Sequence, residues 1–199
     1  MGRSLALLLL FGLSSGFAGA QGRVNSFDAD FSASGLLPVS WATDSPTLSH
    51  LGFDAIVGLE YDSSISIPLR LEAGYIRISA SRIAPTGELY RAWEGARFAL
   101  LSGYLFAPIP VGKLAQLTAS LLAGGGLTAA DFTDTALAYA YPSLILEPRL
   151  ALFIMGAGAS TPVQGPWLAL PIELMFRAGT YTLSPGLSLG WSYRLGAAR

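Results

Sequence analysis

The sequence has no cysteine and very little charge. Only 13% of its 199 residues are charged, against roughly 25% in a typical soluble domain. The absence of cysteine excludes a disulfide scaffold and a thiol nucleophile. The charges of the 12 basic and 13 acidic residues nearly cancel, so the chain lacks the excess of positive charge that would favour binding to nucleic acid. Lysine is almost missing as well, since Lys113 is the one lysine and every other basic residue is arginine.

Long apolar runs are also absent, apart from a short one at the start of the chain. Residues 5–13 are apolar, follow Arg3 and precede the small residues Ala18, Gly19 and Ala20. This arrangement predicts an export signal peptide over 1–20 and a mature domain over 21–199. The later apolar stretches contain prolines and charges, so they do not predict membrane-spanning helices.

What the sequence does contain is a period of two. Between Ser184 and Leu195, large apolar residues alternate with glycine, serine and Arg194. Such alternation is typical of β-strands that present different chemistry on their two faces. The sequence predicts eight strands of this kind, over 27–41, 51–61, 64–75, 97–106, 115–128, 143–154, 167–177 and 184–195.

The charges within these segments all lie on the face that carries glycine and serine. A soluble sheet would turn that face to water, whereas a membrane barrel turns the apolar face to lipid and the polar face inward. Small residues mixed with acids and arginines suit a narrow interior better than a solvated surface. The pattern therefore predicts a charge network in the interior, built around Arg70, Glu72, Arg97, Glu147, Arg149, Glu173, Arg177 and Arg194. Four further acidic residues lie on the same face: Asp28, Asp30, Asp54 and Glu60.

The aromatic residues collect near the predicted strand ends. Two belts of aromatic side chains at the two membrane interfaces are typical of membrane barrels. The residues expected at these interfaces are Trp41, Tyr61, Tyr75, Tyr104, Trp167, Tyr181 and Tyr193.

With these features the chain resembles the small eight-stranded outer-membrane barrels of Gram-negative bacteria, of the OmpA-transmembrane, OmpX and OmpW type. The resemblance rests on the signal peptide, the strand count, the alternation and the final strand 186–195. Such barrels commonly end in an aromatic residue, whereas here residues 196–199 follow the last strand. The resemblance implies an all-β, antiparallel up-and-down transmembrane barrel in the outer membrane. Its expected partners are membrane lipid and the barrel-assembly machinery.

Eight strands enclose an interior that side chains fill, which excludes a wide, porin-like aqueous pore. Two functions remain open from the sequence. The first is a structural or surface-interaction protein that contacts partners through outer loops within 77–95 and 129–142. The alternative, implied by the OmpW resemblance, is a narrow conduit or binding barrel for small hydrophobic molecules. A lumen blocked by ion pairs would favour the first, and a continuous apolar path would favour the second.

Catalysis has little support in the sequence. Small barrel enzymes that modify lipid use a serine–histidine pair, and the single histidine, His50, follows Ser49 directly. Adjacent residues on a strand point to opposite faces, so these two side chains would not meet. We therefore expect no enzyme activity. The sequence also shows no cluster of metal ligands and no phosphate-binding loop, so it predicts neither a metal nor a cofactor.

Overall fold

The computed structural model describes residues 26–42, 45–49, 51–63, 65–78, 93–132, 138–155, 162–177 and 180–197. The expected signal peptide, 1–20, lies outside these residues. No helix in the described part of the chain is long and apolar enough to cross a membrane.

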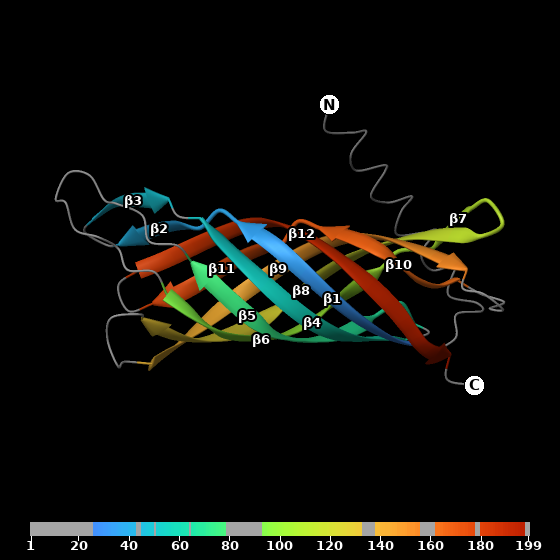
Figure 1. Ribbon diagram of the computed structural model, residues 1–199, viewed down its shortest axis with the longest axis horizontal. Coiled ribbons are helices and arrows are strands. Elements are labelled where there is room, and N and C mark those ends of the chain that lie inside the picture. The colour runs from blue at the N-terminus through green and yellow to red at the C-terminus, as the bar shows by residue number, and fades with distance from the viewer. Residues whose placement is uncertain are drawn as a thin grey trace, which may run out of the picture.

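Twelve β-strands form a closed antiparallel barrel (Figure 1). Some of them are the two parts of one interrupted strand, so the wall consists of eight segments, each running the length of the barrel, which we call staves. Four staves are single strands: β5 (Pro68–Ile78), β8 (Ala115–Phe132), β9 (Ala138–Met155) and β12 (Thr180–Ala197). The other four are interrupted, and each consists of two strands: β1 (Ser26–Leu36) with β2 (Val39–Ala42), β3 (Ser45–Ser49) with β4 (Gly52–Asp62), β6 (Trp93–Leu105) with β7 (Ile109–Val111), and β10 (Pro162–Ala169) with β11 (Ile172–Arg177).

Proline accounts for two of the interruptions. Pro38 separates β1 from β2, and Pro171 separates β10 from β11. A proline has no N–H to donate to the neighbouring strand, so the regular ladder stops there. Neighbouring residues keep the wall continuous, because the N–H of Leu37 donates to Pro185 O at 2.9 Å and that of Gly186 donates to Pro171 O at 2.8 Å.

The barrel closes where the first stave meets the last. Ala33 of β1 pairs with Ala55 of β4 on one side and with Leu189 of β12 on the other. If the pairing is followed from Ala29 through all eight staves, it returns to the first stave at Val39. The staves are therefore inclined to the barrel axis, as closure of a twisted sheet requires.

The strands are longer than the sequence predicted, mainly at the end where the long connections lie. Residues 42–49, expected to be a loop, contain the last residue of β2 and all of β3, and these two strands form a hairpin (Figure 1). β8 and β9 likewise extend into the expected loop 129–142. We call this end the loop end, and the opposite end, which carries β7 and both chain-terminal strand ends, the turn end.

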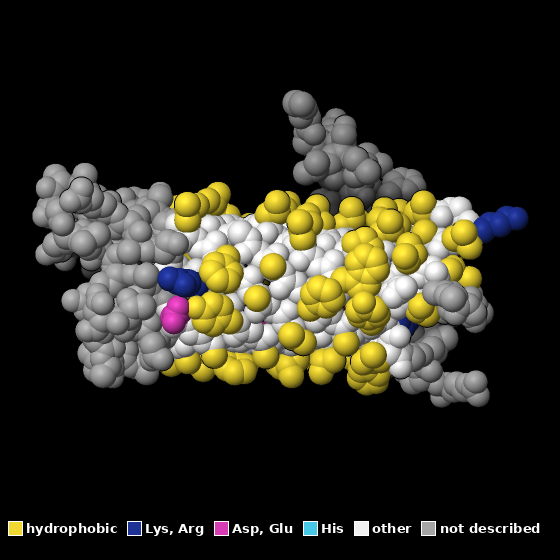
Figure 2. Space-filling view, in the orientation of Figure 1, with side chains coloured by type: hydrophobic (Ala, Val, Ile, Leu, Met, Phe, Trp, Pro, Cys, Tyr) yellow, Lys and Arg dark blue, Asp and Glu magenta, His cyan; other side chains and the backbone are white. Residues whose placement is uncertain are grey.

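Burial alternates along each strand and separates two kinds of side chain. In β4 the carboxylates of Asp54, Glu60 and Asp62 are buried, while Phe53, Val57 and Leu59 are exposed. Apolar side chains cover the middle of the barrel in Figure 2, and charged side chains gather near its ends. The predicted division of the two faces is therefore present in the barrel.

A charge placed on this apolar exterior tests whether it contacts lipid. Leu189 and Leu195 point outward from the same strand and are 62% and 64% exposed, but Leu189 lies mid-strand and Leu195 lies near the strand end. In a bilayer, arginine at the midplane costs about 2–4 kcal/mol and near an interface about 0–1 kcal/mol. We expect Leu189→Arg to lower the unfolding free energy in phospholipid vesicles by the larger amount and Leu195→Arg by the smaller. Equal losses in denaturant titrations would contradict a lipid-facing exterior.

Candidate functional site in the barrel interior

The centre of the interior holds Arg70, whose side chain is completely buried. Its guanidinium donates to both carboxylate oxygens of Asp30, through Nη1 to Oδ2 and through Nη2 to Oδ1 at 2.9 Å. Its Nε donates to Glu72 Oε1 at 2.7 Å, and its Nη1 lies 3.5 Å from Glu60 Oε2. Arginine suits this position because its planar fork can bind several carboxylates at once, whereas a lysine offers a single point charge.

Arg149 lies in the same layer and connects it to Trp167. Its Nη1 donates to Glu60 Oε2 at 2.8 Å, and its Nε lies 3.4 Å from Glu147 Oε1. Its guanidinium carbon is 4.2 Å from the centroid of the Trp167 ring, and that of Arg70 is 5.7 Å from it. The indole thus contributes cation–π contacts in a position shielded from water.

Two glycines make room for these large groups. A Cβ added at Gly190 would meet Cε2, Cζ2 and Nε1 of the Trp167 indole. A Cβ added at Gly58 would meet the guanidinium of Arg70. The interior therefore accommodates the arginines and the tryptophan because the facing positions carry no side chain, as expected for close packing in a narrow barrel.

A second charged layer, around Arg97, lies nearer the loop end. Arg97 Nη1 donates to Asp54 Oδ2 at 3.2 Å, and its Nε lies 3.4 Å from Glu173 Oε2. Ser143 Oγ donates to Glu173 at 2.6 Å. Glu72 links the two layers, since Arg97 Nη1 is 3.8 Å from the carboxylate that also accepts from Arg70.

A third layer lies toward the turn end. Arg194 donates to both carboxylate oxygens of Asp28, at 2.9 and 3.0 Å, and lies 3.9 Å from Asp62. Its guanidinium also covers the ring of Phe153, with 4.7 Å between the guanidinium carbon and the ring centroid. Each of the four interior arginines described thus contacts more than one carboxylate. Sharing of this kind offsets the cost of removing charge from water, and losing one partner leaves a buried charge uncompensated.

The structure brings together most of the predicted network. Seven of the eight residues around which it was predicted take part in the ion pairs described above: Arg70, Glu72, Arg97, Glu147, Arg149, Glu173 and Arg194. The four acidic residues predicted on the same face also take part: Asp28 and Asp30 of β1, and Asp54 and Glu60 of β4. The side chain of Arg177 lies outside the described residues. Asp62 was not among the predicted members, because it ends its strand and follows the alternation only if β4 continues to its last residue.

The prediction for Trp167 was wrong. It was expected at a membrane interface, but it is 3% exposed and lies in the interior. The cause is visible in its own strand, where Leu168 points outward and the alternation therefore turns Trp167 inward. Five other predicted interface aromatics lie against a neighbouring aromatic ring, and the side chain of Trp41 is outside the described residues. These contacts are Tyr61 with Phe27, Tyr75 with Phe53, Tyr104 with Phe106, Tyr181 with Phe176 and Tyr193 with Trp191.

The sequence interpretation also missed the apolar part of the interior. Ala99, Leu101, Leu122 and Ile145 form one buried cluster, and Leu36, Ile76 and Ile78 form another nearer the loop end. A third consists of Ala151, Phe153, Trp167 and Ala169. These residues lie at the alternate strand positions that face inward, so the alternation could have placed them in the interior. The charged and small residues at the other inward positions drew attention away from them.

The serine–histidine pair considered for catalysis lies outside the described part of the chain, which includes neither the side chain of Ser49 nor any of His50. Within that part, no group of three or more histidine, cysteine, aspartate or glutamate side chains is arranged to hold a metal ion. The geometry supports a different role for the charged groups, which is to fill and cross-link the barrel.

Comparison with known proteins identifies the fold. The chain is similar to Neisserial surface protein A, with 15% identity and a TM-score of 0.50 over 86% of this chain and 99% of that chain. It shares the fold of a small eight-stranded outer-membrane barrel. Weaker likenesses are to the attachment invasion locus protein Ail of Yersinia pestis (11% identity, TM-score 0.43, 83% of this chain and 98% of that chain) and to the N-terminal β-barrel domain of Pseudomonas aeruginosa OprF (11%, 0.39, 82% and 97%). No family model matches the sequence, and no curated protein matches it.

Substitution of Gly190 tests the packing around Trp167. We expect Gly190→Ala to lower the unfolding free energy by about 1–3 kcal/mol, because its methyl group would overlap the indole. Gly35→Ala is the matched control, since Gly35 points outward and a Cβ there meets nothing within 4 Å. In a double-mutant cycle, Trp167→Leu should relieve part of the loss. Equal stability of the two alanine variants in denaturant titrations would show that the indole lies elsewhere.

Proposed function

We propose that this chain is an integral barrel of the bacterial outer membrane that acts as a structural or surface-interaction protein. The carrying observation is that three charged layers, around Arg97, around Arg70 with Arg149, and around Arg194, follow one another along the interior. Each layer is held by short, shared ion pairs, and Trp167 is stacked on the central one. A barrel filled in this way favours a role carried out at its ends rather than passage through its centre.

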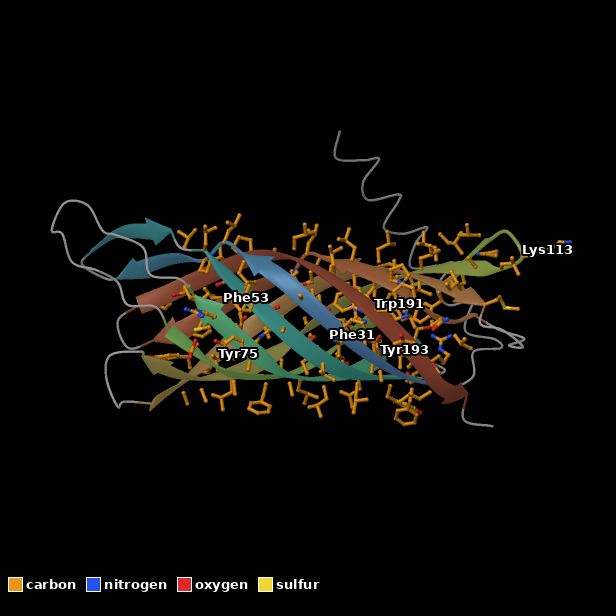
Figure 3. All side chains as sticks on the ribbon, in the orientation of Figure 1. Phe31, Phe53, Tyr75, Lys113, Trp191 and Tyr193 are labelled. Carbon is orange, nitrogen blue, oxygen red and sulfur yellow. The ribbon has the colours of Figure 1, made fainter. Side chains whose placement is uncertain are left out.

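The membrane placement is supported by the exterior. Leucine, isoleucine, valine and phenylalanine side chains are largely exposed around the barrel, where water would leave them unpartnered. Pairs of aromatic rings occur toward both ends, as Figure 3 shows for Phe53 and Tyr75 at one end and for Trp191 and Tyr193 at the other. An apolar band between two aromatic belts is the arrangement that a bilayer selects. Export by a signal peptide and insertion by the assembly machinery belong to the same proposal.

A conduit for small hydrophobic molecules receives less support. Such a path would need apolar lining that continues through the lumen, but the three apolar clusters are separate and charged layers lie between the barrel ends. We accordingly assign the contacts with partners to the connections at the loop end, and we propose no catalytic role.

Cell fractionation tests the placement. We expect the protein in the outer-membrane fraction, resistant to extraction by urea. The folded barrel should bind less detergent than the unfolded chain, so an unheated sample should run faster on a gel than a boiled one. Recovery as a soluble periplasmic protein with no heat-dependent mobility would overturn the proposal.

Flux measurements test the closed interior. Vesicles containing the wild-type protein should release no entrapped sugar, because the ion pairs of Arg70, Arg97 and Arg149 obstruct the lumen. Trp167→Ala removes the largest apolar group from the central layer and should raise ionic conductance in planar bilayers. Heat-dependent gel mobility of the same preparation verifies that the variant has folded. Sugar release by the wild type would refute a closed barrel.

A further inference from the structure

The turn end carries an apolar hairpin that projects past the other strands described at this end (Figure 1). It joins β7 to β8 through Gly112, whose φ of +66° suits glycine, and its tip carries Lys113 (Figures 1 and 3). Ile109, Val111 and Leu114 in this hairpin are 60%, 49% and 68% exposed. Apart from Lys113, residues 105–123 contain no charged side chain.

Strand pairing shows which face these side chains share. Ile109 pairs with Leu117, which pairs with Leu152 of β9, so the three form one row across neighbouring strands. Val111, Ala115 and Ile154 form the next row in the same way. Directly paired residues of antiparallel strands lie on the same face. Both rows therefore continue the outward apolar face of Leu121 and Leu150.

The opposite face of the hairpin differs. Its middle row is Pro110, Gln116 and Phe153, and Phe153 belongs to the barrel interior beneath Arg194. The hairpin is thus two-sided, with an apolar face that extends the barrel exterior and a face that extends the interior.

This apolar face reaches beyond the aromatic belt on its own side of the barrel. Tyr104 pairs with Leu121 of β8 and contacts Phe106. Leu117 lies four residues closer to the turn end than Leu121 on the same strand, a distance of roughly 13 Å. The neighbouring β4–β5 turn adds the exposed side chains of Ile65 and Ile67, and it is tied to β6 by a 2.9 Å bond from Leu105 N to Ser66 O. We call Ile65, Ile67, Ile109 and Val111 the turn-end patch.

We propose that the turn-end patch inserts into the inner leaflet of the membrane and that Lys113 contacts the phosphate groups of anionic phospholipids there. The barrel then sits inclined, with the wall of β5 to β9 deeper in that leaflet than the wall of β1 and β12. This inference rests on the proposed membrane placement. It is supported by continuity, because the patch prolongs the apolar exterior without a polar boundary. It is also supported by charge, because a lysine on a long aliphatic stem at the edge of an apolar surface can reach the headgroups.

The natural absence of cysteine allows single labelling sites. An environment-sensitive fluorophore would be attached to Val111→Cys, on the patch, and to Gln116→Cys, on the opposite face of the same hairpin. Leu189→Cys, mid-strand on the exterior, reports whether the barrel is in the membrane at all. The vesicles contain phosphatidylcholine with phosphatidylglycerol and a fraction of lipid that carries a nitroxide quencher on its acyl chain.

We expect lipid quenching at Val111 to approach that at Leu189 and to exceed that at Gln116 by about threefold. Quenching at Leu189 but not at Val111, with Val111 accessible to a water-soluble quencher, would overturn the insertion while leaving the barrel in the membrane. Protection of Val111 from both quenchers would also overturn it, since another protein surface would then cover the patch. Absence of lipid quenching at both Leu189 and Val111 would instead refute the proposed membrane placement.

A charge variant tests the contact with phosphate. With phosphatidylglycerol present, Lys113→Gln should reduce lipid quenching of the Val111 label, and removal of phosphatidylglycerol should abolish the difference between Lys113 and Lys113→Gln. Quenching that is unchanged by Lys113→Gln in anionic vesicles would refute the role of Lys113.

Discussion

The closure of β1 against β12 is the constraint on which the rest of the molecule depends. Once the first stave pairs with the last, the staves form a closed ring, and backbone groups of the described strands find partners within the wall. Closure also divides every strand into an inside and an outside. The period of two in the sequence then becomes a division between a charged, tightly filled lumen and an apolar exterior.

The composition of the lumen follows from the small space that eight staves enclose. Large groups can enter only where the facing wall carries none, as with Arg70 over Gly58 and Trp167 over Gly190. Charges buried in that space must find partners, and arginine meets the need because one guanidinium can serve several carboxylates. Arg70 and Arg149 share Glu60, and Arg70 and Arg97 share Glu72, so the two layers around these arginines form a connected network rather than separate pairs. The same network that cross-links the staves lies between the two ends of the barrel.

The exterior is less uniform than the lumen. Its apolar surface extends further toward the turn end along β7, β8 and the β4–β5 turn than the aromatic belt alone would mark. A barrel of this kind need not stand upright in a bilayer, because the position of lowest free energy is the one that covers the most apolar surface. Lys113, at the tip of the longest turn-end projection described, lies where the apolar surface stops.

The sequence by itself determined the eight staves, the parity of each strand and the identity of most interior charges. These properties are local: a side chain two residues further along a strand returns to the same face, so Arg70 with Glu72 and Glu147 with Arg149 were bound to be neighbours. The alternation in the sequence also placed Trp167 inward, although the tendency of tryptophan to lie at membrane interfaces led to the opposite prediction. Only the tertiary structure decided which charges meet across the lumen, such as Arg149 with Glu60 and Arg194 with Asp28. Those pairings depend on the stagger between staves that closure imposes, and the stagger is a property of the whole ring rather than of any one strand.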